Sequence, residues 1–193
     1  MVRLIDCTYF TKGERLIQNA PISPDRCVDQ NEIAVRDSIN GWIDSVQEGF
    51  LIAMIGKAMT KILLAYLEGK EIASQRQEAS DGVEEVEIEE AEVEEVETDE
   101  ELEFLANGLK ESLADYVMYH LLRGTQLHVQ NTGAVVLKSV NDTGENTARR
   151  QASVWNTMVK RNLRFLDEAR ERLSNYTICY VTNMVTPINA MNL

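Results

Sequence analysis

The sequence predicts a mainly α-helical fold: a helical bundle with a small β-hairpin, extended N- and C-terminal arms and an acidic inserted loop. Three observations lead to this prediction. Apolar residues recur at helical spacing in several stretches, they alternate on either side of one glycine-bearing turn, and acidic residues are concentrated in one segment. Because 193 residues are the length of one ordinary domain, we expect a single core.

The chain is expected to begin with an extended arm over residues 1–24, which lack helical periodicity. The helical domain then covers residues 25–175. Its first helical pattern bends at Gly49 and stops at Gly69, because glycine weakens a helix interior by roughly 1 kcal/mol relative to alanine. The apolar residues of this pattern are Ile39, Trp42, Ile43, Val46, Phe50, Met54, Ala58, Ile62 and Leu63.

Residues 71–97 are predicted to form an acidic insertion. Between Glu78 and Glu103 there are fifteen acidic residues and no Lys or Arg, whereas the rest of the chain has 17 acidic and 19 basic residues. The net charge of −13 therefore comes from this one segment. Because like charges repel and large apolar groups are few, we expect a solvated insertion; it also lacks the alternating oxygen ligands of a calcium loop.

A second helical pattern begins at Thr98, which forms a capping box with Glu101, and ends near Gly124. Its apolar or aromatic face consists of Leu102, Leu105, Leu109, Leu113, Tyr116, Val117 and His120.

Residues 125–138 alternate around Asn131-Thr132-Gly133, which predicts a β-hairpin. A last helix follows, and residues 176–193 are expected to be an extended C-terminal arm. The buried stripe of the last helix is expected to be Trp155, Met158, Val159, Leu163, Leu166, Ala169 and Leu173.

No motif points to catalysis, so we expect no enzyme activity, no cofactor and no metal. Gly56-Lys57 lacks the spacing and the Ser or Thr of a phosphate-binding loop, and the two histidines, His120 and His128, lack a third zinc ligand at suitable spacing. Cys179 has no activating group nearby in sequence. The N-terminus shows no secretory signal and the longest apolar stretch is interrupted by lysines, so the sequence favours a cytoplasmic protein outside the membrane.

Three stretches carry a resemblance to a known family. Residues 108–122, Gly-Leu-Lys-Glu-Ser-Leu-Ala-Asp-Tyr-Val-Met-Tyr-His-Leu-Leu, are followed by residues 129–138, Val-Gln-Asn-Thr-Gly-Ala-Val-Val-Leu-Lys. Together with Leu4-Ile-Asp-Cys-Thr-Tyr-Phe10 near the start, they resemble head-tail connector (adaptor) proteins of tailed bacteriophages. The order of elements agrees with that family, and the acidic insertion departs from it.

The resemblance implies a structural virion protein at the neck, made in the host cytoplasm, that forms a ring, usually of twelve copies. Its partners would be copies of itself, the portal protein and tail or neck proteins, with genomic DNA passing nearby without sequence-specific binding. A closed ring needs two different complementary surfaces on each subunit. For these surfaces the expected residues are Tyr9, Phe10, Arg161, Arg164, Tyr176 and Tyr180.

Two other classes of protein stay open at this point. A small cytoplasmic helical adaptor or regulatory binding module would use the same bundle and would be monomeric or dimeric. An enzyme with an unrecognised site would need a deep pocket whose polar groups have perturbed pKa values. A mass measurement distinguishes the first, and the structure bears on the second.

Overall fold

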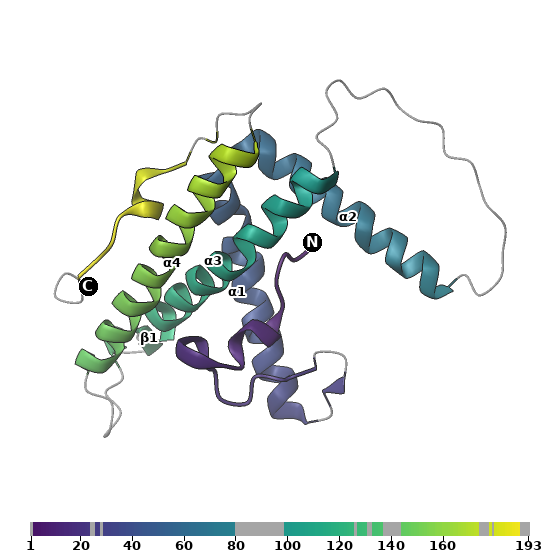
Figure 1. Ribbon diagram of the computed structural model, residues 1–193. Helices are drawn as coiled ribbons and strands as arrows, with labels where there is room; N and C mark the ends of the chain where they lie inside the picture. The colour runs from purple at the N-terminus through teal and green to yellow at the C-terminus, as the bar shows by residue number, and fades with distance from the viewer. Residues whose placement is uncertain are drawn as a thin grey trace.

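The computed structural model describes residues 2–23, 26, 27, 29–79, 99–125, 127–130, 133–136, 144–173, 178 and 180–189. This part of the chain is mainly helical, which confirms the predicted fold class at that level. Helices α1, α3 and α4 lie side by side, whereas α2 leaves the bundle and projects away from it (Figure 1). The helices are α1 (Gln30–Ile55), α2 (Lys57–Ala79), α3 (Asp99–Thr125) and α4 (Gly144–Arg172).

A side-chain cap explains where α1 begins, and the backbone conformation of a glycine explains where it ends. At its start, the Asp29 carboxylate accepts a hydrogen bond of 2.9 Å from the Asn31 N–H and caps the helix. At its end, Gly56 has φ +79° and ψ 163°, a region that essentially only glycine adopts. The predicted bend at Gly49 is wrong, because Gly49 lies inside unbroken α1 and the chain turns at Gly56 instead.

Helix α2 is longer than the sequence pattern indicates. Gly69, the predicted end, lies in its interior, because a solvent-exposed glycine weakens a helix without breaking it. The helix continues to Ala79, so residues 71–79 of the predicted acidic insertion are helical. The rest of the insertion and the predicted start at Thr98 lie outside the described residues.

Helices α3 and α4 pack against each other and form the centre of the core. Gly108 allows their close approach, because a Cβ atom there would stand 2.6 Å from the Phe165 ring. The predicted stripe of α4 is buried except for Leu163, which is 45% exposed to solvent. Buried residues of the two predicted stripes are Leu102, Leu105, Leu109, Leu113, Val117, Trp155, Met158, Val159, Leu166, Ala169 and Leu173.

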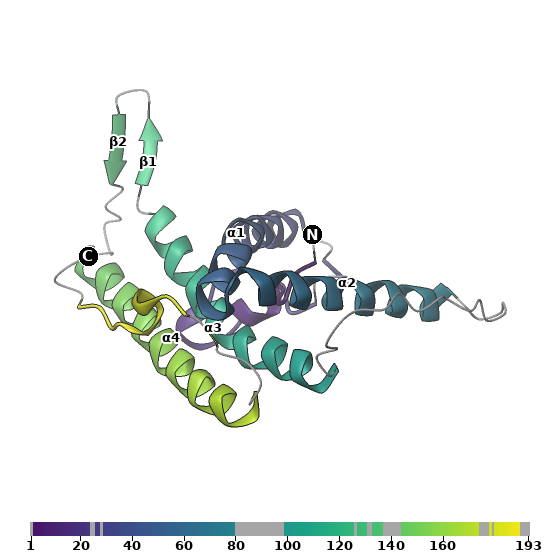
Figure 2. The same ribbon diagram turned by 90° about the horizontal axis from the view of Figure 1, so that it is seen from above.

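Two short strands follow α3 within the range predicted for a hairpin. β1 (Leu127–Gln130) pairs antiparallel with β2 (Gly133–Val136), with Leu127 opposite Val136. The pair extends away from the bundle (Figure 2). Gly124 does not end α3, which runs to Thr125; a Cβ at Gly124 would stand 2.6 Å from the Trp42 ring, so packing against α1 explains the glycine.

The predicted extended N-terminal arm is wrong for residues 2–23, which fold onto the bundle. They contain two short 3-10 helices, η1 (Cys7–Phe10) and η2 (Gly13–Arg15). The fully buried Gln47 of α1 holds this segment, since its side chain accepts from the Leu4 N–H (2.7 Å) and donates to the Val2 carbonyl (2.8 Å). The apolar side chains of the segment enter the core without helical periodicity, and they are Leu4, Ile5, Cys7 and Phe10.

The C-terminal segment, described at residues 178 and 180–189, also lies on its own bundle. It contains the 3-10 helix η4 (Thr182–Val185) and runs along α4, with the Met184 side chain buried (Figure 1). The Val181 N–H donates to the Ala53 carbonyl (2.8 Å), one of the carbonyls left without a helical partner in the last turn of α1. Of the predicted extended arm 176–193, the described residues include the 3-10 helix η4 and are packed on the chain's own bundle.

Candidate functional site

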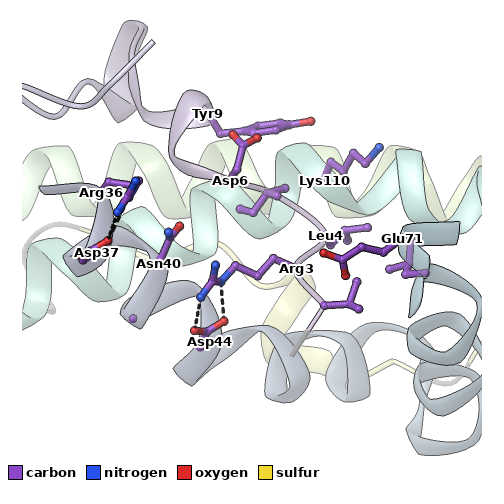
Figure 3. Close-up of a pocket in the computed structure, with 14 residues that line it drawn as sticks. Arg3, Leu4, Asp6, Tyr9, Arg36, Asp37, Asn40, Asp44, Glu71 and Lys110 are labelled. Carbon is purple, nitrogen blue, oxygen red and sulfur yellow. Dashed lines mark hydrogen bonds and ion pairs between the residues drawn. The ribbon is translucent and has the colours of Figure 1, made fainter. Parts of the chain in front are cut away.

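A polar groove of about 1100 Å³ opens between the N-terminal segment, α1 and parts of α2 and α3 (Figure 3). Folding residues 2–9 back over α1 creates it, because their side chains form one wall and α1 forms the other. The charged and polar lining residues are Arg3, Asp6, Tyr9, Arg36, Asp37, Asn40, Asp44, Glu71 and Lys110.

The charges of this groove are largely paired. Arg3 donates through Nε and Nη2 to the two carboxylate oxygens of Asp44, each at 2.7 Å, and this hydrogen bonding lowers the pKa of Asp44. Arg36 also forms an ion pair with Asp37, with 2.9 Å between Arg36 Nη2 and Asp37 Oδ1. The buried Oδ1 of Asn40 has no hydrogen-bond partner among the described residues. The groove therefore fits a polar chain segment with an N–H to offer better than a strongly charged ligand.

A second polar cluster is buried between α3, α4 and η2. The Asp115 carboxylate, 3% exposed as a residue, pairs with Arg161 of α4, and Arg15 Nε lies 3.6 Å away. Arg15 also pairs with Glu111 at 2.5 Å. Burial raises the pKa of Asp115 to about 6, although both arginines lower it. These charges hold three elements together; Asp115 itself is buried, whereas Arg15 and Glu111 also line a pocket of about 680 Å³ beside η2.

Helix α4 holds the N-terminal segment through a further clamp. The Arg150 guanidinium donates to the Glu14 carbonyl (2.8 Å) and the Leu16 carbonyl (2.9 Å). Ser153, one turn later, donates to the Glu14 carboxylate at 2.9 Å. Part of the basic side of α4 therefore binds the N-terminal segment of the same chain.

The predicted interface residues do not form one site. Phe10 is fully buried in the core, so it cannot contact another subunit, and Arg161 is engaged with Asp115. Tyr9 is half-buried and lines the groove, Arg164 is exposed on α4, and Tyr180 is 37% exposed. Tyr176 lies outside the described residues.

Sequence reasoning missed the polar side chains that hold the chain ends. Gln47, Asn156 and Asn162 each bind backbone groups of a terminal segment. Their one available signal is their position, since each is a polar residue within or beside an apolar helical stripe.

His120 lies among aromatic rings of its own helix. The His120 ring lies 4.5 Å from the Tyr116 ring and 5.4 Å from the Tyr119 ring, and burial lowers its pKa. Over the described ranges, no three His, Cys, Asp or Glu side chains are arranged to hold a metal ion. None of the described helices is long and apolar enough to cross a membrane.

Comparisons with protein-family models, with curated proteins and with solved structures find no match to this chain.

Proposed function

We propose that this chain is a structural subunit of a ring that joins a capsid portal to a tail, as a head-tail connector. The observation that carries the proposal is the projecting helix α2. From Glu68 to Ala73 every residue of α2 is exposed, and the helix extends beyond the bundle (Figure 2). Tyr66 and Lys70 still contact α3, but the exposed stretch beyond them is only marginally stable in water by itself, so a neighbouring molecule is expected to cover it.

One side of α2 suits packing against another helix. Ile62 and Ile72 are 44% and 52% exposed, and the exposed Ala65, Gly69 and Ala73 lie on the same side. At about 100° per residue, these positions fall within one stripe of roughly a quarter to a third of the helix circumference. Small residues let a partner helix approach closely, while the two isoleucines supply apolar area.

A ring also needs a second, different surface on each subunit, and α4 provides a candidate for it. Its outward side carries Leu163, exposed, beside the exposed cations Lys160 and Arg164. An apolar residue framed by cations differs in chemistry from the α2 stripe, as a head-to-tail ring contact demands. The order of bundle, paired strands and final helix also agrees with the resemblance to head-tail connectors.

The test is the assembly state of the purified chain, alone and with a portal protein. Mass photometry should show particles of several subunit masses, and negative-stain imaging should show that they are annular. Ile62→Glu with Ile72→Glu should abolish them while leaving the helical circular dichroism unchanged. Ile22→Glu is the matched control, because Ile22 is 85% exposed and lies far from α2 in the chain. A chain that stays monomeric at every concentration and never binds portal overturns the proposal.

A second candidate, a small helical adaptor or regulatory binding module, is favoured by the polar groove over α1. Its buried Asn40 acceptor and paired charges suit a segment of a partner protein. This alternative gives a monomer or dimer that binds one partner chain. The same mass measurement therefore distinguishes it from the ring.

A further inference from the structure

Four of the seven charged side chains that line the polar groove over α1 neutralise one another (Figure 3). Arg3 pairs with Asp44 through two hydrogen bonds of 2.7 Å, and Arg36 pairs with Asp37 at 2.9 Å. Because these groups already have partners of opposite charge, they gain little from a charged ligand. The charge that selects a ligand therefore comes from the other three lining residues.

These three residues are Asp6, Glu71 and Lys110. In the described part of the chain, no Lys or Arg side chain forms an ion pair with Asp6 or Glu71. Asp6 Oδ1 accepts from the Thr8 N–H (2.8 Å), and the Lys110 ammonium donates to the Asn107 amide oxygen (2.8 Å). Two carboxylates and one ammonium leave this set with a net charge of −1.

The Tyr9 ring lies beside Asp6 on the same wall of the groove (Figure 3). Tyr9 is half-buried; burial raises the pKa of its hydroxyl, and the nearby carboxylates of Glu111 and Asp6 raise that pKa further. An aromatic face next to a carboxylate without a cation is a favourable place for an ammonium or guanidinium group. Lysine and arginine carry these groups on long apolar stems that can lie along a tyrosine ring.

The same groove offers main-chain and amide groups to an extended segment. Gln47 binds the Val2 carbonyl and the Leu4 N–H, so the main-chain groups of Arg3 between them point away from Gln47, because these groups alternate along an extended chain. Within the described residues, no hydrogen bond reaches the N–H or the carbonyl of Arg3, and Asn40 Oδ1 has no partner. These groups suit pairing with the main chain of an added strand.

We propose that the groove binds an extended segment of a partner protein that carries one arginine or lysine. The cation lies beside Asp6 and the Tyr9 ring, Glu71 adds attraction, and the main chain of the segment pairs with Arg3. One cation suffices, because most of the charges in the groove are already paired. The lining includes no residue of α4 and neither Ile62 nor Ile72, so the inference goes beyond the ring. It rests on the groove that favours the second candidate function and names the chemistry of its partner.

The test selects short random peptides from a display library on the immobilised full-length chain and measures the selected peptides by fluorescence anisotropy. We expect them to contain arginine or lysine, and replacing that residue by glutamine should weaken binding. In NMR spectra of the chain, peptide addition should shift the amide signals of Arg3 and Gly41, which line the groove, and leave that of Leu163 in place. Selection of acidic or purely apolar peptides, or of none, overturns the proposal. Absence of rings overturns the ring alone, because peptide binding is measured independently of assembly.

Charge variants of the groove give a second measurement, with signs that a purely structural role does not produce. Asp6→Asn and Glu71→Gln should each weaken binding of a selected peptide by about two- to fivefold, the range for one exposed ion pair. Asparagine keeps the oxygen that accepts from Thr8, so η1 retains its cap. Lys110→Gln should tighten binding, because it removes a repelling charge from the groove.

Glu68→Gln is the matched control for these variants. Glu68 is exposed on α2 and does not line the groove, so the same change of charge there should leave the affinity unchanged. The differences between variants should decrease as ionic strength rises. Equal affinities for all four variants, or weaker binding by Lys110→Gln, show that the peptide does not occupy this groove and overturn the proposal.

Discussion

At the scale of single residues, the buried carboxylate of Asp115 has the largest described electrostatic effect. Two arginines reach it, yet removal from water still favours its protonated form, and its pKa is raised to about 6. Asp44 shows the opposite case on the surface, because the hydrogen bonds from Arg3 lower its pKa and water still reaches the pair. The two groups therefore give opposite dependences of stability on pH.

Asp115→Asn is predicted to flatten the stability profile between about pH 4 and pH 6. The folded pKa lies above the unfolded value of 3.8, so the folded state binds more protons in this window and its stability falls as pH rises. The decrease for the unsubstituted chain relative to Asp115→Asn should be on the order of 2–3 kcal/mol, at about 1.4 kcal/mol per pKa unit. Urea unfolding at a series of pH values measures it.

Asp44→Asn serves as the control with the opposite sign. Its lowered pKa means that its contribution is present above the unfolded pKa and disappears as pH falls through the folded pKa. If Asp115→Asn and the unsubstituted chain show parallel profiles from pH 4 to pH 6, the buried carboxylate does not titrate as described.

At the scale of elements, the helix break at Gly56 sets the direction of the projecting helix α2. The sequence contains glycines at 49, 56 and 69 in one long apolar pattern, and only backbone dihedral angles distinguish them. Gly49 and Gly69 retain helical geometry, whereas Gly56 alone of the three has positive φ. A pattern of side chains cannot carry that information, which is why the bend was predicted at the wrong residue.

Gly56→Ala should destabilise the fold by about 1–3 kcal/mol, because alanine must then adopt a backbone region that is nearly restricted to glycine. Gly49→Ala is the matched substitution within a helix, with no atom near the added Cβ, and should stabilise by about 0.5–1 kcal/mol. Thermal unfolding of both variants gives the comparison. Equal effects at the two positions would contradict a turn at Gly56.

Helical periodicity predicted most of the packing of α3 and α4, since core residues there repeat every three or four positions. It failed for Leu163, which fits the period but lies at the edge of the stripe and faces solvent. It also failed for Leu4 to Phe10, because side chains that fill gaps between helices need no regular spacing. The groove and the side-chain amides that hold the chain ends could not be predicted, since they depend on where the chain ends return to the bundle.

At the scale of the whole molecule, both described chain ends complete the core. The N-terminal segment lies against α1 and α3 and is clamped by α4, and the C-terminal segment lies on α4 and bonds to α1. Removing either segment would expose apolar side chains of the helices beneath. The ends therefore belong to the same cooperative unit as the bundle.

Phe10→Ala is predicted to cost about 3–5 kcal/mol of unfolding free energy, the usual cost of truncating a buried phenylalanine. Ile22→Ala, at the exposed end of the same segment, should stay within about 0.5 kcal/mol of the unsubstituted chain. Urea unfolding followed by circular dichroism measures both. Similar small effects for the two would mean that residues 2–23 do not contribute to the core.

The hydrogen bond from Val181 to Ala53 joins the corner after α1 to a residue close to the end of the chain. During synthesis, α1 leaves the ribosome long before residue 181 is made, so the Ala53 carbonyl cannot form this bond until the segment that follows α4 has been synthesised. A chain truncated before residue 181 would lack both this bond and the buried Met184 side chain, so it should be less stable than the chain that contains them.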